Sequence, residues 1–454
     1  MDNQLKYDIK DKPKKWYEWI LYPLQMILAV FVATVLIANI CGTPISSCLL
    51  GACVGTIVYQ VITRFKSPMF ISSCGATVSA VCGALAMNET GNYLMVLIGG
   101  IIILIIYVIF ALIIKFKGIN LINKIFPPYI VGAITIVIGL NLAKFLVGYT
   151  NLSGLDGNSP INIQIDYLIQ PYVICSMVVA IVTMLITAVV SHYGKGFMKN
   201  IPFLFGLAGG YVLAIIISLC GVTIPTTDGP IPFIDFSVFK GINVIGLPDF
   251  AFLHITSDQW SWTNFGQTIL FFVPVAICAL LEHYSDHKVL SNIIGKDLIK
   301  DPGMDKTLIG DGVASALGTA ICGLPNTSYG ESIATIGFSR VASVLMTTIA
   351  AAALGVLAFF PPIAALINSI PSCVFGGCAM ILYGYIAASG LKTIINNKVD
   401  LENNKMLIVV SVILTVGVSG IAFIVPAFAG VSLAMVLGVI LNLILVERKP
   451  KQIN

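Results

Sequence analysis

Three acidic side chains in otherwise apolar stretches are the residues of this sequence best placed to do chemistry. Glu282 and Asp286 stand four residues apart in LEHYSDH, and Glu331 lies in NTSYGES. A helix brings residues four apart onto one face, where two negative charges repel each other. No Lys or Arg stands near the middle of any apolar run. We therefore expect one acid of the Glu282 and Asp286 pair to hold a proton, as a group that takes up and releases protons would.

The composition decides the solvent in which these acids work. Hydrophobic residues make up 57% of the chain and charged residues 10%, whereas ordinary globular domains carry about 25% charged residues. The chain must therefore face lipid over most of its length, which excludes a soluble enzyme, a secreted disulfide scaffold and a disordered chain. A charged group facing lipid at mid-membrane costs about 2.5–3.5 kcal/mol. All three acids are thus expected to face protein or water.

Net charge and cysteine usage remove further classes of protein. The net charge is only +4, which gives no reason to expect nucleic-acid binding. The 11 cysteines include no CxxC pair and lie inside apolar runs, where a free Cys behaves as a small hydrophobic residue. We expect no disulfide, no metal site and no cofactor.

Fourteen apolar runs are candidate membrane spans, because about 20 apolar residues cross roughly 30 Å of hydrocarbon as a helix. Lys and Arg test this count, since cytoplasmic loops retain them. With fourteen spans, every Lys and Arg except Lys144 and Lys240 lies on the cytoplasmic side, as do both termini. The first run has the length of a span and is expected to be a transmembrane helix, not a cleaved signal peptide. The runs are 22–41, 45–63, 69–87, 93–114, 125–147, 170–191, 201–222, 266–285, 308–323, 325–340, 341–365, 370–390, 404–425 and 430–446.

The runs divide into two halves of seven, which must have opposite orientations because seven is odd. Pro127 and Gly132 in run 5 have the same spacing as Pro371 and Gly376 in run 12. Inverted repeats of this kind are typical of secondary transporters.

Runs 3 and 10 form a second matched pair, and both are expected to be interrupted. Pro68 precedes FISSCGAT at 70–77, and Pro325 precedes NTSYGES at 326–332. Non-helical backbone survives at membrane depth only where it lines a cavity, and its free N–H groups can then bind a ligand. We therefore expect non-helical stretches near 71–75 and 327–331 that meet at the centre of the protein and mark the substrate site.

Other polar residues have simpler interpretations. Asp286 precedes His287 and Lys288, so the alternative to a coupling role is a solvated position near the end of run 8. Asp311 is expected to be a plain interfacial residue. The sequence also predicts loop positions for His192 and His254, and a hydrogen bond from His283 to a neighbouring helix.

Longer motifs resemble a known family. LEHYSDHKVLSNIIGKDLIKDPGMDK at 281–306 and GDGVASALGTAICGLPNTSYGESIATIGFSR at 310–340 are similar to segments of the nucleobase-ascorbate transporters, most closely the bacterial uracil permeases. PPYIVGAITIVIGLNLA at 127–143 and IPSCVFGGCAMILYGYIAASGLKTII at 370–395 also resemble family segments. The resemblance therefore extends over most of both halves.

This resemblance implies an all-α polytopic membrane protein. Its fourteen spans would form two inverted seven-span repeats, with short antiparallel strands interrupting spans 3 and 10. A core domain would comprise residues 1–115 (spans 1–4) and 264–365 (spans 8–11). A gate domain would comprise residues 116–223 (spans 5–7) and 366–454 (spans 12–14). The resemblance also suggests a homodimer.

The same resemblance implies a substrate site built from two acids and exposed backbone. Glu282 and Glu331 would bind the nucleobase, and Asp286 with Glu282 would couple transport to protons. The other positions implied as substrate-binding are Gly330, Ser73, Cys74 and Gly75, which would supply backbone contacts, and Ala33, Tyr329 and Tyr383, which would line the pocket.

Together these features predict a proton-coupled symporter that imports a nucleobase, with uracil favoured, across a bacterial inner membrane. Three departures bear on the substrate: Ser332 replaces the Asn of the usual YGEN, Ser285 replaces a glycine, and Gly75 replaces a bulky aromatic. A smaller residue at position 75 leaves a xanthine or purine symporter as the alternative, and Na⁺ is the alternative coupling ion.

Two further function classes are disfavoured. An anion transporter of the same general fold would have its anion repelled by Glu282 and Glu331. A membrane enzyme is not expected, because the apolar runs contain no HExxH motif, no paired nucleophile and base, and no metal-ligand cluster.

Overall fold

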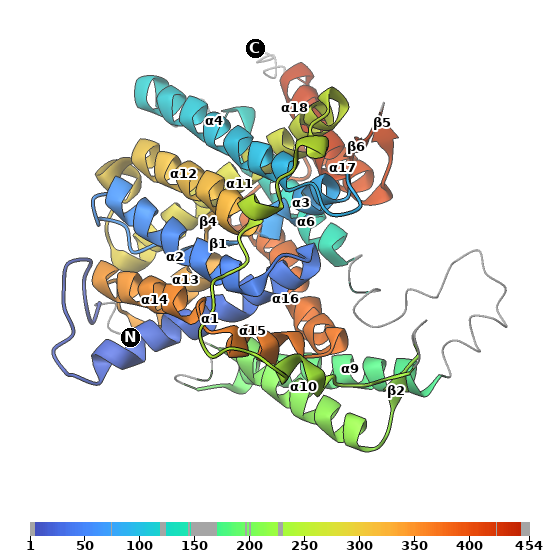
Figure 1. Ribbon diagram of the computed structural model, residues 1–454. Coiled ribbons are helices and arrows are strands. Elements are labelled where there is room, and N and C mark those ends of the chain that lie inside the picture. The colour runs from blue at the N-terminus through green and yellow to red at the C-terminus, as the bar shows by residue number, and fades with distance from the viewer. Residues whose placement is uncertain are drawn as a thin grey trace, which may run out of the picture.

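The computed structural model describes residues 5–73, 75–118, 124–143, 146, 170–195, 198, 201–225, 230–423 and 425–445. Helices dominate these residues (Figure 1). Among the described residues, seven helices are long and apolar enough to cross a membrane, and the bent pair α14 (Val344–Leu357) and α15 (Pro361–Asn368) would make an eighth. The chain is therefore a multi-pass membrane protein. The seven are α1 (Glu18–Cys41), α2 (Ile45–Ile62), α4 (Tyr93–Lys117), α9 (Pro171–Tyr193), α10 (Pro202–Leu219), α11 (Trp262–Ile294) and α16 (Ser372–Asn396).

Shorter elements complete the described part of the chain. Apolar stretches of 10–17 residues comprise η1 with α3 (Gly75–Thr77 and Val78–Leu85), α6 (Pro128–Leu142), α17 (Asn404–Ser419) and α18 (Val431–Ile444). The remaining helical elements are α12 (Met304–Cys322), α13 (Gly330–Ser339), η4 (Phe236–Phe239), η5 (Ala251–His254), η6 (Ser257–Gln259) and the π-helical turn η7 (Ile299–Gly303). The strands are β1 (Ile71–Ser73), β2 (Thr223–Ile224), β3 (Ile231–Pro232), β4 (Asn326–Ser328), β5 (Ala422–Phe423) and β6 (Val425–Ala429).

Some predicted runs differ from the helices that the chain forms. The run at 266–285 is part of the longer helix α11, whose polar continuation beyond the run includes His287, which is buried against protein. The continuous apolar run at 341–365 bends by 83° between α14 and α15. Pro361 starts the new helix, since proline fits the first turn and disfavours helix in the residue before it.

The helices pack into two groups that are interleaved in sequence. In the first group, α12 lies against α2 and α4, α14 against α1 and α2, and α11 against α3 and α4. In the second group, α16 lies against α6 and α9, α10 against α9, and α17 against α6 and α18. Figure 1 shows α9 and α10 apart from α2, α4 and α12. Each group therefore combines segments from both halves of the chain.

Two short strands at the centre of the first group bring distant segments together (Figure 1). β1 pairs antiparallel with β4, with Ile71 opposite Ser328 and Ser73 opposite Asn326. Thr56 of α2 both donates to the carbonyl of Ile71 at 2.9 Å and accepts from its N–H at 3.0 Å. These bonds satisfy backbone groups that an unpaired strand would leave bare in an apolar interior. Helical structure resumes after each strand, so two helix starts face the middle of the bundle.

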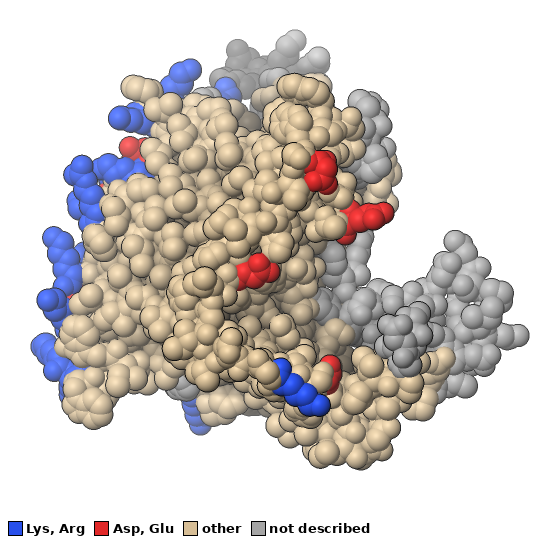
Figure 2. Space-filling view, in the orientation of Figure 1, with Lys and Arg blue, Asp and Glu red and all other residues tan. Residues whose placement is uncertain are grey.

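Basic residues gather on one side of the molecule. In Figure 2 most of the Lys and Arg side chains in view lie along the left edge. The segment 230–261, which joins β3 to α11, crosses the face shown in Figure 1 and is held by contacts such as the bond from Asn92 Nδ2 to the carbonyl of Gln259 at 2.9 Å. This segment links the two helix groups.

The contact between α6 and α16 depends on small residues. A Cβ added at Gly390 would lie 2.5 Å from the carbonyl oxygen of Gly132 and 2.7 Å from the backbone nitrogen of Ile136. These neighbours are backbone atoms, so they cannot move aside as a flexible side chain does. The two helices can therefore approach this closely only with glycine at 390.

We expect Gly390→Ala to destabilise the protein by about 1–3 kcal/mol, the usual cost of overpacking. Gly384→Ala is the matched control on the same helix, because its Cβ would meet nothing within 4 Å. Thermal unfolding of both purified variants measures the difference. Equal melting temperatures would show that α6 and α16 do not pack this closely.

Candidate functional site

A cavity of about 80 Å³ lies between the two helix groups, next to the central strands. It is lined from the first group by α1, η1, α11 and the start of α13, and from the second group by α6 and α16. Every residue that was predicted for the substrate site and that the structure describes lines it, except Ser73. The predicted residues present are Ala33, Gly75, Glu282, Tyr329, Gly330, Glu331 and Tyr383.

The other two predicted residues, Ser73 and Cys74, are adjacent in the chain. Ser73 is the last residue of β1 and is fully buried, but it does not line the cavity. Its Oγ has no hydrogen-bond partner among the described residues. Cys74 lies outside the described residues.

Backbone atoms face the small cavity just after strands β1 and β4, where the chain becomes helical again. A Cβ at Gly330 would meet nothing within 4 Å, and one at Gly75 would meet only Ile386 Cδ1, at 3.6 Å. The first N–H groups of a helix lack acceptors within it, and α13 begins at Gly330 and Glu331. The site thus offers hydrogen-bond donors from backbone beside acceptors from carboxylates.

A second cavity of about 440 Å³ adjoins the first. Both cavities are lined by Glu282, Gly330, Glu331 and Ile386, so they meet at the two carboxylates. The larger cavity also reaches Asp286 and, in the second group, Ser191, which hydrogen-bonds Tyr385 at 2.7 Å. Asp286 therefore lies beside the larger cavity, whose lining is mostly apolar, and not beside the small one.

Three carboxyl groups line these cavities, those of Glu282, Asp286 and Glu331. Asp286 interacts electrostatically with Glu282, Glu331 and Asp311, and Glu282 interacts with Glu331 and Asp311. No Lys or Arg is among the described residues that line the two cavities. Like charges that lie close together repel one another. We therefore expect at least one of these acids to hold a proton.

The sequence as a whole can now be compared with known proteins. A sequence model described as the Permease family matches residues 17–444. The chain belongs to the Permease family. The resemblance to uracil permeases found from the motifs is confirmed.

Curated relatives of this Permease-family chain match it over nearly their full length. The uracil permease of Bacillus subtilis (strain 168) is 33% identical over 449 residues, covering 98% of this chain and 96% of that protein. The uracil permease of Paenibacillus larvae is 34% identical over 425 residues, covering 92% of each chain. The uracil permease of Escherichia coli (strain K12) is 30% identical over 423 residues, covering 93% of this chain and 90% of that protein.

Solved structures share the fold of this Permease-family chain. The transmembrane domain of the cyanobacterium bicarbonate transporter BicA superposes with a TM-score of 0.62 at 15% identity, covering 96% of this chain and 98% of that one. SLC26A9 superposes with a TM-score of 0.62 at 14% identity, covering 94% of this chain and 64% of that one. At such low identity these likenesses concern the fold alone.

Two predictions for single residues were wrong in this Permease-family chain. His192 was expected in a loop but lies in the last turn of α9. Asp311 is not interfacial: it is fully buried on α12, where its Oδ2 lies 2.8 Å from Nδ1 of His283 on α11. His287, one turn further along α11, is also buried and lies 2.7 Å from the hydroxyl of Tyr59 on α2. The three helices are thus joined by polar contacts immediately behind Glu282 and Asp286.

The sequence carried little sign of this arrangement. A buried acid and an interfacial acid look alike in a hydropathy plot, and the partner of Asp311 lies on another helix. His283 and His287 are four residues apart, as Glu282 and Asp286 are, and each histidine directly follows one of the acids. Residues four apart lie on one face of a helix, so this spacing was the sign of a buried polar face in the sequence.

We expect Asp311→Ala to cost about 3–5 kcal/mol of stability, because it leaves His283 buried without its partner. Asp305→Ala, in the first turn of the same helix, serves as the control, since Asp305 forms no ion pair among the described residues. Thermal unfolding of both proteins in detergent measures the difference. If the two variants melt together, the buried pair does not stabilise the packing of α11 on α12.

Proposed function

We propose that this protein is a proton-coupled symporter that imports a nucleobase, with uracil as the favoured substrate. The observation that carries the proposal is the meeting of Glu282 and Glu331 with helix-start backbone in one cavity, whose described lining residues include no Lys or Arg. The names of the curated relatives, uracil permeases, support the same substrate class.

The chemistry of a pyrimidine base fits this cavity. Uracil is flat and neutral, with ring N–H donors beside carbonyl acceptors. Carboxylates at Glu282 and Glu331 would accept the N–H bonds, and backbone amides at the start of α13 would donate to the carbonyl oxygens. The glycines at 75 and 330 leave room for a planar ring to approach the backbone. No covalent chemistry is needed, so we do not propose an enzyme.

Transport would proceed by alternating access between the two helix groups. In this proposal the fourteen sequence runs are fourteen spans in two inverted repeats, with both termini cytoplasmic. The first helix group corresponds to the core domain (1–115 and 264–365) and the second to the gate domain (116–223 and 366–454). Support comes from the cavity itself, which is lined by both groups and therefore changes when one moves against the other. A homodimer and a bacterial inner-membrane location belong to the same proposal.

Proton coupling would involve Asp286 and Glu282. Both line the larger cavity, so a proton could reach them from water without crossing lipid. Na⁺ remains the alternative coupling ion.

A xanthine or purine symporter is the second candidate for the substrate. The observation in its favour is the open space at Gly75, where only Ile386 would contact a side chain. An anion transporter is disfavoured despite the shared fold, because the acids in the cavity would repel its substrate.

Uptake competition tests the substrate. Cells that lack their own uracil permease and express this protein should accumulate labelled uracil. Excess unlabelled uracil should block uptake, whereas thymine, hypoxanthine and ascorbate should compete weakly. Stronger competition by xanthine than by uracil would move the assignment to the purine alternative, and no uptake of any base would overturn the proposal.

A further inference from the structure

The segment that precedes α1 is fixed to the first helix group by backbone hydrogen bonds. Lys6 N donates to the carbonyl of Arg340 at 2.8 Å, Ala342 N donates to that of Tyr7 at 2.8 Å, and Val344 N donates to that of Ile9 at 3.1 Å. Tyr7 and Val341 form a parallel β-bridge. The segment therefore runs alongside the connection between α13 and α14.

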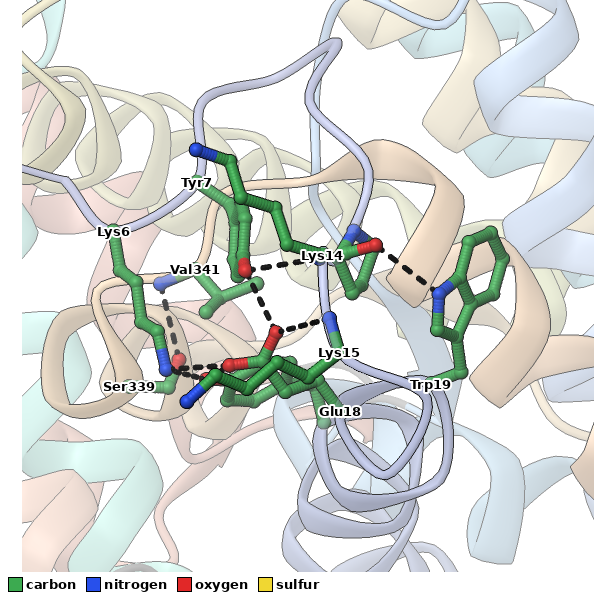
Figure 3. A network of polar contacts seen from close by, with 10 residues as sticks. Lys6, Tyr7, Lys14, Lys15, Glu18, Trp19, Ser339 and Val341 are labelled. Atoms are coloured by element: carbon green, nitrogen blue, oxygen red, sulfur yellow. Dashed lines mark hydrogen bonds and ion pairs between the residues drawn. The ribbon is translucent and has the colours of Figure 1, made fainter.

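Side chains close the same segment onto the start of α1 (Figure 3). Glu18 is 1% exposed, and its carboxylate accepts from Tyr7 OH at 2.6 Å and pairs with Lys6 Nζ at 2.8 Å. The hydrogen bond to Glu18, followed by that to Tyr22, raises the pKa of Lys6 above its usual range. Glu18 is thus neutralised by Lys6 within the network.

Two further bonds shape the loop that leads into the helix. Lys14 N donates to Tyr7 OH at 3.1 Å, and Trp19 Nε1 donates to the carbonyl of Pro13 at 3.2 Å (Figure 3). Ser343 Oγ donates to the carbonyl of Asp11 at 2.6 Å. These hydrogen bonds fix the conformation of the loop, whereas the side chains on its outer surface make few contacts with the rest of the protein.

The exposed side chains of this loop are mainly basic and aromatic, with Asp11 as an exposed acid among them. Lys10, Lys12, Lys14 and Lys15 are exposed, and none of them forms an ion pair among the described residues. Next to them, where α1 begins, Trp16 is 78% exposed and Ile20 is 62% exposed. Exposed Trp at the end of a membrane span is characteristic of the headgroup region.

We propose that residues 10–20 form a preshaped docking surface for anionic phospholipid headgroups. The four lysines would meet the lipid phosphates, while Trp16 and Ile20 enter the adjoining acyl region. A flexible basic tail would also attract anionic lipid, but the hydrogen bonds around Tyr7 and Glu18 hold this one in place before lipid binds. The segment therefore loses its conformational entropy during folding, and this loss does not weaken lipid binding.

Charge neutralisation gives the direct test. A Lys near an anionic membrane surface contributes about fivefold to binding, so Lys12→Gln with Lys14→Gln and Lys15→Gln should weaken binding about 100-fold. Native mass spectrometry of the full-length protein, titrated from neutral detergent with phosphatidylglycerol or phosphatidylcholine, measures it. The triple variant should lose phosphatidylglycerol binding and keep phosphatidylcholine binding.

A matched control neutralises three lysines elsewhere. Lys392, Lys398 and Lys405 flank the connection between α16 and α17, where Asp400 and Glu402 are interspersed. Their replacement by Gln should change phosphatidylglycerol binding less than tenfold. Equal losses in the two triple variants would overturn the proposal, as would an unchanged affinity in the first.

Two further results bear on the shape and on the ligand. Tyr7→Phe keeps all four lysines but removes the hydroxyl that joins Glu18 to Lys14. It should therefore weaken phosphatidylglycerol binding several-fold, and no change would overturn the claim of a preshaped surface.

Inorganic phosphate should displace no more lipid than chloride of equal ionic strength. Displacement by phosphate alone would indicate a soluble-phosphate site instead.

Discussion

Glu331→Gln is expected to weaken nucleobase binding by about 10- to 150-fold, the loss of one charged hydrogen-bond acceptor worth about 1.5–3 kcal/mol. Glu282→Gln is expected to have an effect of the same size. Both carboxylates line the small cavity, at the start of α13 and on α11. Each substitution preserves shape while replacing a charged acceptor by an amide. Isothermal titration of purified protein in detergent with uracil measures the affinities.

The control for this pair is an acid far from the cavity. Glu402→Gln lies in an exposed turn between α16 and α17 and should bind uracil with wild-type affinity. Melting temperatures of all three variants separate loss of binding from loss of folding. Wild-type affinity in folded Glu331→Gln and Glu282→Gln proteins would remove both residues from the substrate site.

Asp286→Asn is expected to abolish concentrative uptake while allowing binding and exchange. The amide resembles a permanently protonated carboxyl, so the variant could load substrate but could not release a proton to complete a coupled cycle. Asp286 lines the larger cavity beside Glu282, with which it interacts electrostatically. Accumulation and counterflow, measured in the same proteoliposomes, distinguish coupled transport from exchange.

A solvated Asp286 would give a different result. Replacement of a surface residue usually changes little, so Asp286→Asn would then accumulate substrate normally under a pH gradient. In that case Asp286 is not the coupling residue, and Glu282 becomes the remaining candidate.

Sequence reasoning identified the residues of the small cavity better than it identified the polar contacts behind them. Glu282 and Glu331 stood out because each is an acid in an apolar run, and the expense of a charge in lipid forces such a residue to face protein or water. The structure brings both to one cavity. Their roles in binding remain predictions.

The burial of Asp311 could not be predicted from the sequence in this way. Its burial depends on His283, which lies on a different helix, and helix pairing cannot be deduced from hydropathy. The bend between α14 and α15 was missed for a different reason. The run was apolar throughout, so hydropathy alone favoured one straight helix, whereas the prolines at 361 and 362 started another.

The most direct test of proton-coupled uracil import is uptake into proteoliposomes that contain only this protein. With an inward proton gradient and no Na⁺, labelled uracil should accumulate above its external concentration. A protonophore should abolish that accumulation while leaving exchange of bound uracil intact. Accumulation driven only by a Na⁺ gradient, or no accumulation under any proton gradient, would contradict the proposed coupling and with it the role assigned to the acids of the cavity.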